Sequence, residues 1–147
     1  MKSATGLAAA LAAALALGGC ATDARLRDSE KLAIYEAHAG VPVDSFQYFG
    51  SINGWTPLGD SAIALWTRPR EAWLLDLYGP CPDIPYAPAI SVSNQMGRVS
   101  ARFDKVLARG STSIDIPCAI RQIRPLDVKA IRQAERVARD QPADSGT

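Results

Sequence analysis

The residue with the clearest chemistry in this sequence is Cys20, which ends the segment Leu-Gly-Gly-Cys at residues 17–20. An Ala/Leu-rich run over residues 6–17 leads into it, and Lys2 places a positive charge before that run. A basic start, a short apolar run and small residues before a cysteine resemble a bacterial lipobox, where the thiol takes a diacylglyceryl group before the peptide is cut. The run is shorter than the about 20 apolar residues of a membrane-spanning helix. We therefore expect residues 1–19 to be a signal peptide and Cys20 to be lipidated.

Lipidation of Cys20 would make a membrane the first partner of this chain. Several acyl chains anchor a protein stably, because each buried methylene contributes about 0.8 kcal/mol. The next residue is Ala21, where an Asp would resemble an inner-membrane retention signal. We therefore expect the periplasmic side of the outer membrane, with the inner membrane or the periplasm as alternatives. An ordinary cleaved signal peptide with Cys20 as a bystander is the other interpretation of this segment.

The remaining two cysteines, Cys81 and Cys118, form an even pair in a chain expected to be exported. Thiols in an oxidising compartment most often pair, so we expect a disulfide between them. Such a bridge would restrict the unfolded chain by about 4 kcal/mol in the entropy model. The alternative is a free thiol that forms a nucleophile pair with His38, the only histidine.

Acid–base chemistry would have to come from carboxylates, of which Asp60, Asp76, Asp104 and Asp115 are the candidates. Paired acids serve glycosidases when their separation is right, but carboxylates on surface strands and turns explain these positions equally well. The sequence has no nucleophile elbow, phosphate loop, zinc-helix motif or dinucleotide fingerprint. We therefore expect no catalytic residue, metal or cofactor. A small carboxylate-dependent hydrolase is the alternative.

Two tryptophans, Trp55 and Trp66, are candidates for a ligand face, because exposed aromatic rings stack on sugars. Such a face would suit a wall-glycan binder or an inhibitor of an envelope enzyme, with the cell wall or a periplasmic protein as partner. A packed second face of the sheet is the simpler interpretation. Trp73 is expected in the core.

A basic stripe follows the last expected helix, where Lys129, Arg132 and Arg136 are spaced by three and four residues and share one face. It is either a solvated face or a contact with anionic headgroups. The formal net charge is +1, from sixteen basic and fifteen acidic residues, and falls to zero once Lys2 is removed with the signal peptide. A neutral chain lacks the basic excess of a nucleic-acid binder, so no nucleic-acid partner is expected.

The elements that must position these residues centre on residues 62–81, which predict two apolar strands folded back by a polar turn that holds Pro69. Further strands are expected over residues 43–55, 89–93, 98–103 and 114–120. Alternation places one set of side chains inward, namely Phe46, Tyr48, Ile52, Ile63, Leu65, Trp73, Leu75, Leu77, Val99, Ala101, Phe103, Ile114, Ile116, Cys118 and Ile120. Pro117 restricts its strand to an edge, or to a start after Pro117.

Helices are expected at both ends of the chain. Residues 21–39 carry apolar side chains at helical spacing and predict a short helix that also serves as a spacer from the membrane. Asp127 is expected to cap a last helix that packs by Val128, Ile131, Ala134 and Ala138.

The predicted fold class is α+β: an antiparallel sheet of about six strands, flat or curled into a partial barrel, with an N-terminal and a C-terminal helix. Residues 1–19 would be the signal peptide, 20–44 the lipidated N-terminus and helical spacer, 45–140 the single globular domain, and 141–147 a flexible tail.

Three stretches, residues 73–84, 103–106 and 118–127, resemble a domain-of-unknown-function family of small exported proteobacterial proteins, many of them lipoproteins. They read Trp-Leu-Leu-Asp-Leu-Tyr-Gly-Pro-Cys-Pro-Asp-Ile, Phe-Asp-Lys-Val and Cys-Ala-Ile-Arg-Gln-Ile-Arg-Pro-Leu-Asp. The likeness covers about residues 45–127 and rests chiefly on the two cysteines in their contexts. It implies export and the pairing of the cysteines, and it brings no activity. The expected function is a lipid-anchored periplasmic accessory or binding protein without catalysis.

Overall fold

A central β-hairpin organises the fold. The computed structural model describes residues 26–110 and 116–141. In it, β3 (Ala62–Arg68) and β4 (Glu71–Leu77) pair antiparallel, with Arg68 opposite Glu71 across the turn. Ile63, Leu65 and Leu75 are completely buried. The predicted hairpin is confirmed, because its two apolar strands bury both of their faces.

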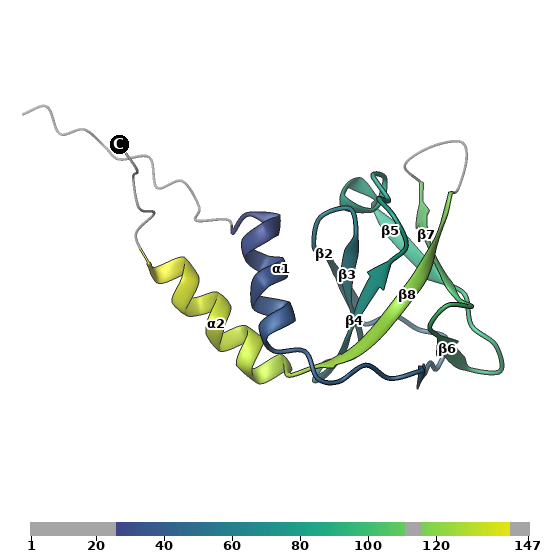
Figure 1. Ribbon diagram of the computed structural model, residues 1–147, viewed down its shortest axis with the longest axis horizontal. Coiled ribbons are helices and arrows are strands. Elements are labelled where there is room, and N and C mark those ends of the chain that lie inside the picture. Colours follow the sequence, from purple (N-terminus) through teal and green to yellow (C-terminus); the bar gives the residue numbers. More distant parts are fainter. Residues whose placement is uncertain (1–25, 111–115, 142–147) are drawn as a thin grey trace, which may run out of the picture.

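The hairpin belongs to a six-stranded antiparallel sheet in the order β2-β3-β4-β8-β7-β5, which curls into a half-barrel (Figure 1). Both helices lie on one side of this sheet, so the predicted α+β class is confirmed. The other elements are α1 (Asp28–Ala37), β1 (Ser45–Gln47), β2 (Gly54–Pro57), the 3-10 helix η1 (Ile84–Tyr86), β5 (Ala89–Val92), β6 (Arg98–Ser100), β7 (Lys105–Arg109), β8 (Pro117–Leu126) and α2 (Val128–Asp140). No helix in the described ranges is long and apolar enough to cross a membrane.

Strand β8 joins the two parts of the sheet, because it pairs with a different neighbour on each side. Its first residues pair with β7, where Pro117 faces Leu107, and its later residues pair with β4. The expectation of an edge strand, or of one that starts after Pro117, was wrong: β8 is an interior strand and Pro117 is its first residue, where a proline interrupts no ladder hydrogen bond. The register then shifts beside Asp76 and Leu77. This irregularity lets Ile120 and Ile123, three residues apart, be buried in the same cluster.

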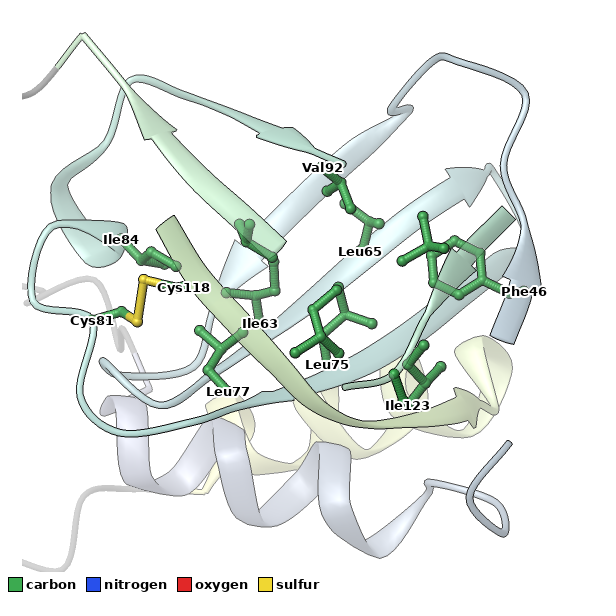
Figure 2. Packing of buried hydrophobic residues seen from close by; sticks show 14 of the residues in the cluster. Phe46, Ile63, Leu65, Leu75, Leu77, Cys81, Ile84, Val92, Cys118 and Ile123 are labelled. Carbon is green, nitrogen blue, oxygen red and sulfur yellow. A yellow bond between two sulfur atoms is a disulfide. The ribbon is translucent and has the colours of Figure 1, made fainter. Parts of the chain in front are cut away.

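The main hydrophobic cluster fills the inside of the half-barrel (Figure 2). The two-stranded pair of β1 and β6 supplies Phe46 and Val99 to it, with Phe46 opposite Val99. The half-buried Trp73 packs on Phe46 with ring centroids 4.9 Å apart and planes at 11°. The expected inward face of the hairpin is thus found, and β1 and β6 close the open side over it.

A second cluster packs the two helices on the other face of the sheet. Alternation along β3 and β4 turns Ala62, Ala64 and Leu74 to this face, where Ile131 of α2 and Tyr35 of α1 cover them. Tyr35 is 3% exposed. The segment expected as a spacer therefore contains a helix that is packed onto the sheet. The segment before Leu26, with Cys20, and residues 142–147 lie outside the described residues.

Parts of the strand prediction were wrong. Residues 43–55 do not form one strand, because Gly50 adopts a φ of 81° and separates β1 from β2. Strand β7 was not expected. Phe103 was expected inward and is 74% exposed, because Arg102 has a φ of 70° and turns the chain after β6.

Ile116 was also expected inward, but its side chain is 60% exposed. It lies one residue before the first paired residue of β8, Pro117, so the strand alternation does not reach it. Ile114 and Asp115 lie outside the described residues.

Candidate functional site

Helix α2 begins at a side-chain cap that fixes which of its faces is exposed. The Oδ1 atom of Asp127 accepts a hydrogen bond from the backbone N–H of Ala130 at 3.0 Å, as the sequence predicted. Val128 and Ile131 are buried against the sheet. The predicted inward residues Ala134 and Ala138 are half-buried. Lys129, Arg132 and Arg136 are all exposed.

These three cations line one side of a groove of about 530 Å³, called the basic groove here. Its other cation is Arg70, from the turn between β3 and β4, and the remaining lining residues are Leu126, Asp127 and Val128. The Nη2 atom of Arg132 donates a hydrogen bond to the backbone oxygen of Pro69 at 2.9 Å. This bond holds the start of α2 against the turn of the central hairpin.

The four cations of the basic groove carry charge that no carboxylate neutralises within the described residues. Other arginines nearby are paired: Arg139 lies 3.6 Å from Glu135, and Arg124 lies 3.2 Å from Asp76. Asp127 is the single carboxylate in the lining, and its Oδ1 atom is engaged in the helix cap. The positive end of the α2 dipole points toward the same place. The arrangement therefore suits binding of an anion.

Sequence reasoning found the stripe of α2 but missed Arg70. The stripe follows from helical spacing alone, whereas Arg70 lies far away in the chain and reaches the groove only through the packing of α2 on the sheet. The signal that could have found it is the polar hairpin turn, because a short turn presents its side chains to solvent.

The candidate carboxylates Asp76 and Asp104 have different hydrogen-bond partners, and neither shares a partner with the other. Asp76 is 6% exposed, and its Oδ2 atom lies 3.2 Å from the Nη2 atom of Arg124. Asp104 is 2% exposed and accepts hydrogen bonds from the Ser93 hydroxyl and the Ser100 backbone N–H, each at 2.7 Å. The two acids share none of these partners.

Asp60 is exposed, and its backbone oxygen accepts a hydrogen bond from the N–H of Cys81 at 2.7 Å. Asp115 cannot be placed, because it lies in the gap between the described ranges. No group of three or more His, Cys, Asp or Glu side chains among the described residues could hold a metal ion.

The two candidate tryptophans lie on opposite faces of the sheet. Trp55 faces Leu65 across the ladder and packs against the cluster inside the half-barrel. Trp66 faces Gly54 and packs against the helix-side cluster, with its ring 6.1 Å from that of Tyr35 in an edge-on contact. Both side chains are half-buried, so Trp55 and Trp66 do not form one stacking platform.

A disulfide joins Cys81 and Cys118, whose Cα atoms are 6.2 Å apart. It is packed beside Ile84 at the edge of the inner cluster (Figure 2), and each cysteine is 6% exposed. The predicted bridge is confirmed, and neither sulfur is a free thiol for His38. His38 ends α1, and its backbone oxygen accepts a hydrogen bond from the N–H of Asp127 at 3.0 Å.

A second, smaller groove of about 350 Å³ lies between α1, α2 and the sheet, on the other side of Arg132. Tyr35 and Glu135 both line this groove, and the Tyr35 hydroxyl donates a hydrogen bond to Oε1 of Glu135 at 3.2 Å. Burial raises the pKa of Tyr35, and the Glu135 carboxylate raises it further. Tyr35 therefore stays neutral in the folded protein and links the two helices.

Comparison with known proteins gives one finding. The model of a family of unknown function (DUF6491) matches residues 1–142, which is nearly the whole chain. No curated protein and no solved structure matches it significantly. The resemblance to a domain-of-unknown-function family is confirmed to this extent, and the chain belongs to the family of unknown function DUF6491.

Proposed function

We propose that this chain is a lipid-anchored, non-catalytic accessory or binding protein of a proteobacterial envelope. Cys20 holds it on the periplasmic side of the outer membrane. The observation that carries the proposal is the buried Cys81–Cys118 disulfide, because such bonds persist in oxidising compartments and are rare in the cytosol. The lipobox-like segment at residues 17–20 supplies the independent support from sequence.

A binding role fits the chemistry of the described residues better than catalysis. Asp76 is engaged by Arg124, and Asp104 by Ser93 and Ser100, so these carboxylates have structural roles. The basic groove gathers four cations that form no ion pair within the described ranges. The binding surface of the proposal is therefore the exposed side of α2, turned toward anionic headgroups.

The position of the anchor would keep the domain near a bilayer. Helix α1 starts at Asp28, eight residues after Cys20 (28 − 20 = 8). Eight residues span at most about 28 Å when fully extended. Lipidation would therefore keep the domain close to the bilayer, within a few Debye lengths of its charges.

The proposal is tested by replacing Cys20 with Ser in the full chain and expressing it in a proteobacterial host. We expect the original chain to incorporate a labelled fatty acid and to fractionate with membranes. Cys20→Ser should lose the label and give an uncleaved or soluble product. Ala21→Ser is the matched control, because it keeps the thiol and should still be labelled. A processed, membrane-bound Cys20→Ser protein would show that the anchor is not Cys20.

A further inference from the structure

We propose that the basic groove is a binding site for the phosphate group of an anionic phospholipid, with Arg70 and Arg132 as its principal donors. This inference rests on the proposed function, because the lipid anchor brings the groove to a bilayer. The inference adds the turn between β3 and β4 to the membrane-facing surface. This turn contributes Arg70, which is not part of the basic stripe of α2.

The groove has two walls that approach each other from separate elements. Arg70 comes from the turn of the central hairpin, and Arg132 comes from α2. The hydrogen bond from Arg132 to the Pro69 oxygen uses one N–H of a guanidinium that carries five. Arg132 and Arg70 line the same groove, and planar guanidinium groups match the oxygens of a phosphate.

The positive charge of the groove is a local concentration on a chain that is nearly neutral. The whole chain has a formal net charge of +1, yet Arg70, Lys129, Arg132 and Arg136 gather in one place. Arg124 and Arg139, on the same side of the sheet, are paired with carboxylates. Four positive charges against the single carboxylate of Asp127 attract an anion with more than one oxygen.

The expected lipid anchor at Cys20 keeps the domain near a bilayer, so a lipid headgroup is the nearest source of phosphate. Arg68, the last residue of β3, is paired with Glu71 at 3.3 Å and places its guanidinium carbon 4.9 Å from the ring centre of Phe49. Phe49 is 59% exposed. An exposed aromatic ring with a cation on its face suits the headgroup layer of a membrane, where both an apolar and a polar surface are available. The groove is also open on the outside of the domain, as a lipid headgroup requires.

The test uses the lipid-free chain of residues 21–147, which contains every described residue and therefore the whole packed unit. Its binding to vesicles of phosphatidylglycerol mixed with phosphatidylcholine is compared with its binding to phosphatidylcholine alone. We expect a preference for the anionic vesicles that weakens as salt rises from about 0.02 M to about 0.15 M. Arg70→Gln should weaken the binding about fivefold, and Arg70→Lys should recover most of it.

Arg121→Gln is the matched control, because Arg121 is exposed on β8 and does not line the groove. It removes the same charge and should change vesicle binding by less than about twofold. An equal loss in Arg70→Gln and Arg121→Gln would overturn the proposal, since the binding would then follow net charge alone. Absence of any preference for anionic vesicles at low salt would overturn it as well.

A second measurement distinguishes a lipid headgroup from free phosphate as the ligand of the groove. Inorganic phosphate and glycerol 3-phosphate are titrated into the labelled lipid-free chain while backbone amide resonances are recorded. Weak shifts confined to Arg70 and the first turn of α2, together with the vesicle preference, support a headgroup site. Saturable phosphate binding without any vesicle preference would overturn the headgroup assignment. These measurements use a chain without Cys20, so their outcome is independent of the lipidation test. The headgroup site can be refuted while the lipid anchor is confirmed, and the reverse is also possible.

Discussion

Arg132 on α2 donates its Nη2 hydrogen bond to the backbone oxygen of Pro69, in the turn of the central hairpin, at 2.9 Å. This contact joins a helix near the end of the chain to the strands on which the sheet is built. It also fixes one wall of the basic groove relative to the other. Replacing Arg132 should therefore affect stability more than replacing Arg70, although each variant removes one charge.

The first prediction compares Arg132→Gln with Arg70→Gln. Arg132→Gln loses the bond to Pro69 and should lower the free energy of unfolding by about 0.5–1 kcal/mol, as expected for a partly solvated hydrogen bond. Arg70→Gln should change it by less than about 0.5 kcal/mol, because Arg70 is exposed in a turn. Urea denaturation of the lipid-free chain measures both values. Equal effects of the two substitutions would show that the Pro69 bond contributes no stability.

The second prediction concerns the disulfide. Cys81 and Cys118 are separated by 37 residues, and closing such a loop restricts the unfolded chain by about 4 kcal/mol in the entropy model. Cys81→Ser with Cys118→Ser should lose much of this, measured by urea denaturation. Adding reductant should destabilise the original lipid-free chain by a similar amount and leave the double variant unchanged. Two thiols available for labelling in the denatured, unreduced protein would contradict the bridge.

The third prediction concerns Asp104, which lies buried in the turn before β7. Asp104→Ala should destabilise the fold by about 2–3 kcal/mol, because the Ser100 N–H and the Ser93 hydroxyl both lose their acceptor in a buried place. Asp60→Ala is the control: its side chain is exposed, and the change should stay within about 0.5 kcal/mol. Similar values for the two variants would contradict a structural role for Asp104.

The fourth prediction is a dependence of stability on alkaline pH that Tyr35 causes. Its pKa is raised in the folded protein, chiefly by burial, above the about 10 of an unfolded chain. The unfolded state therefore loses the Tyr35 proton first as the pH rises, which favours unfolding. The contribution of Tyr35 is fully present below about pH 10 and is lost progressively above it.

Urea denaturation at about pH 8 and about pH 11 tests this dependence. Tyr35→Phe should lose less stability between the two values than the original chain does. Tyr86→Phe is the control, because Tyr86 is 83% exposed, and it should behave like the original chain. An unchanged alkaline loss in Tyr35→Phe would show that another group causes it.

Local pattern predicted the parts of this fold in which neighbouring residues decide the structure. The hairpin of β3 and β4 follows from two apolar runs around Pro69, and the start of α2 follows from the capping residue Asp127. The alternation held to Ala101, which is buried, and failed beyond it because Arg102 adopts a left-handed backbone conformation, which is uncommon for a residue with a side chain. Nothing in the alternation of residues 98–103 signals that turn.

The candidate site was predictable only in part, because it depends on contacts between distant segments. Helical spacing identified three of its four cations, while Arg70 joins them through the packing of α2 against the hairpin turn. Trp55 and Trp66 were grouped as one face from sequence. The ladder register pairs Trp55 with Leu65 and Trp66 with Gly54, which sends the two rings to opposite faces.

The last prediction separates holding the protein at a membrane from orienting it there. Changing Lys129, Arg132 and Arg136 together to Gln removes three charges, each of which contributes about 1 kcal/mol near an anionic surface. An acyl anchor contributes about 0.8 kcal/mol for every buried methylene, so it far exceeds their sum. The full-length triple variant should therefore still fractionate with membranes, as the original chain does.

The lipid-free triple variant should instead lose its binding to anionic vesicles, and the loss should be greatest at low salt, where the charges are least screened. The control is the original chain, whose membrane fractionation is measured in cells and whose lipid-free form is measured for vesicle binding in solution. Release of the full-length triple variant from membranes would mean that the basic side of α2, and not the lipid, holds the domain. Undiminished vesicle binding by the lipid-free variant would mean that the basic side of α2 is only solvated, because a surface that orients a protein on anionic lipid must lose affinity with its cations.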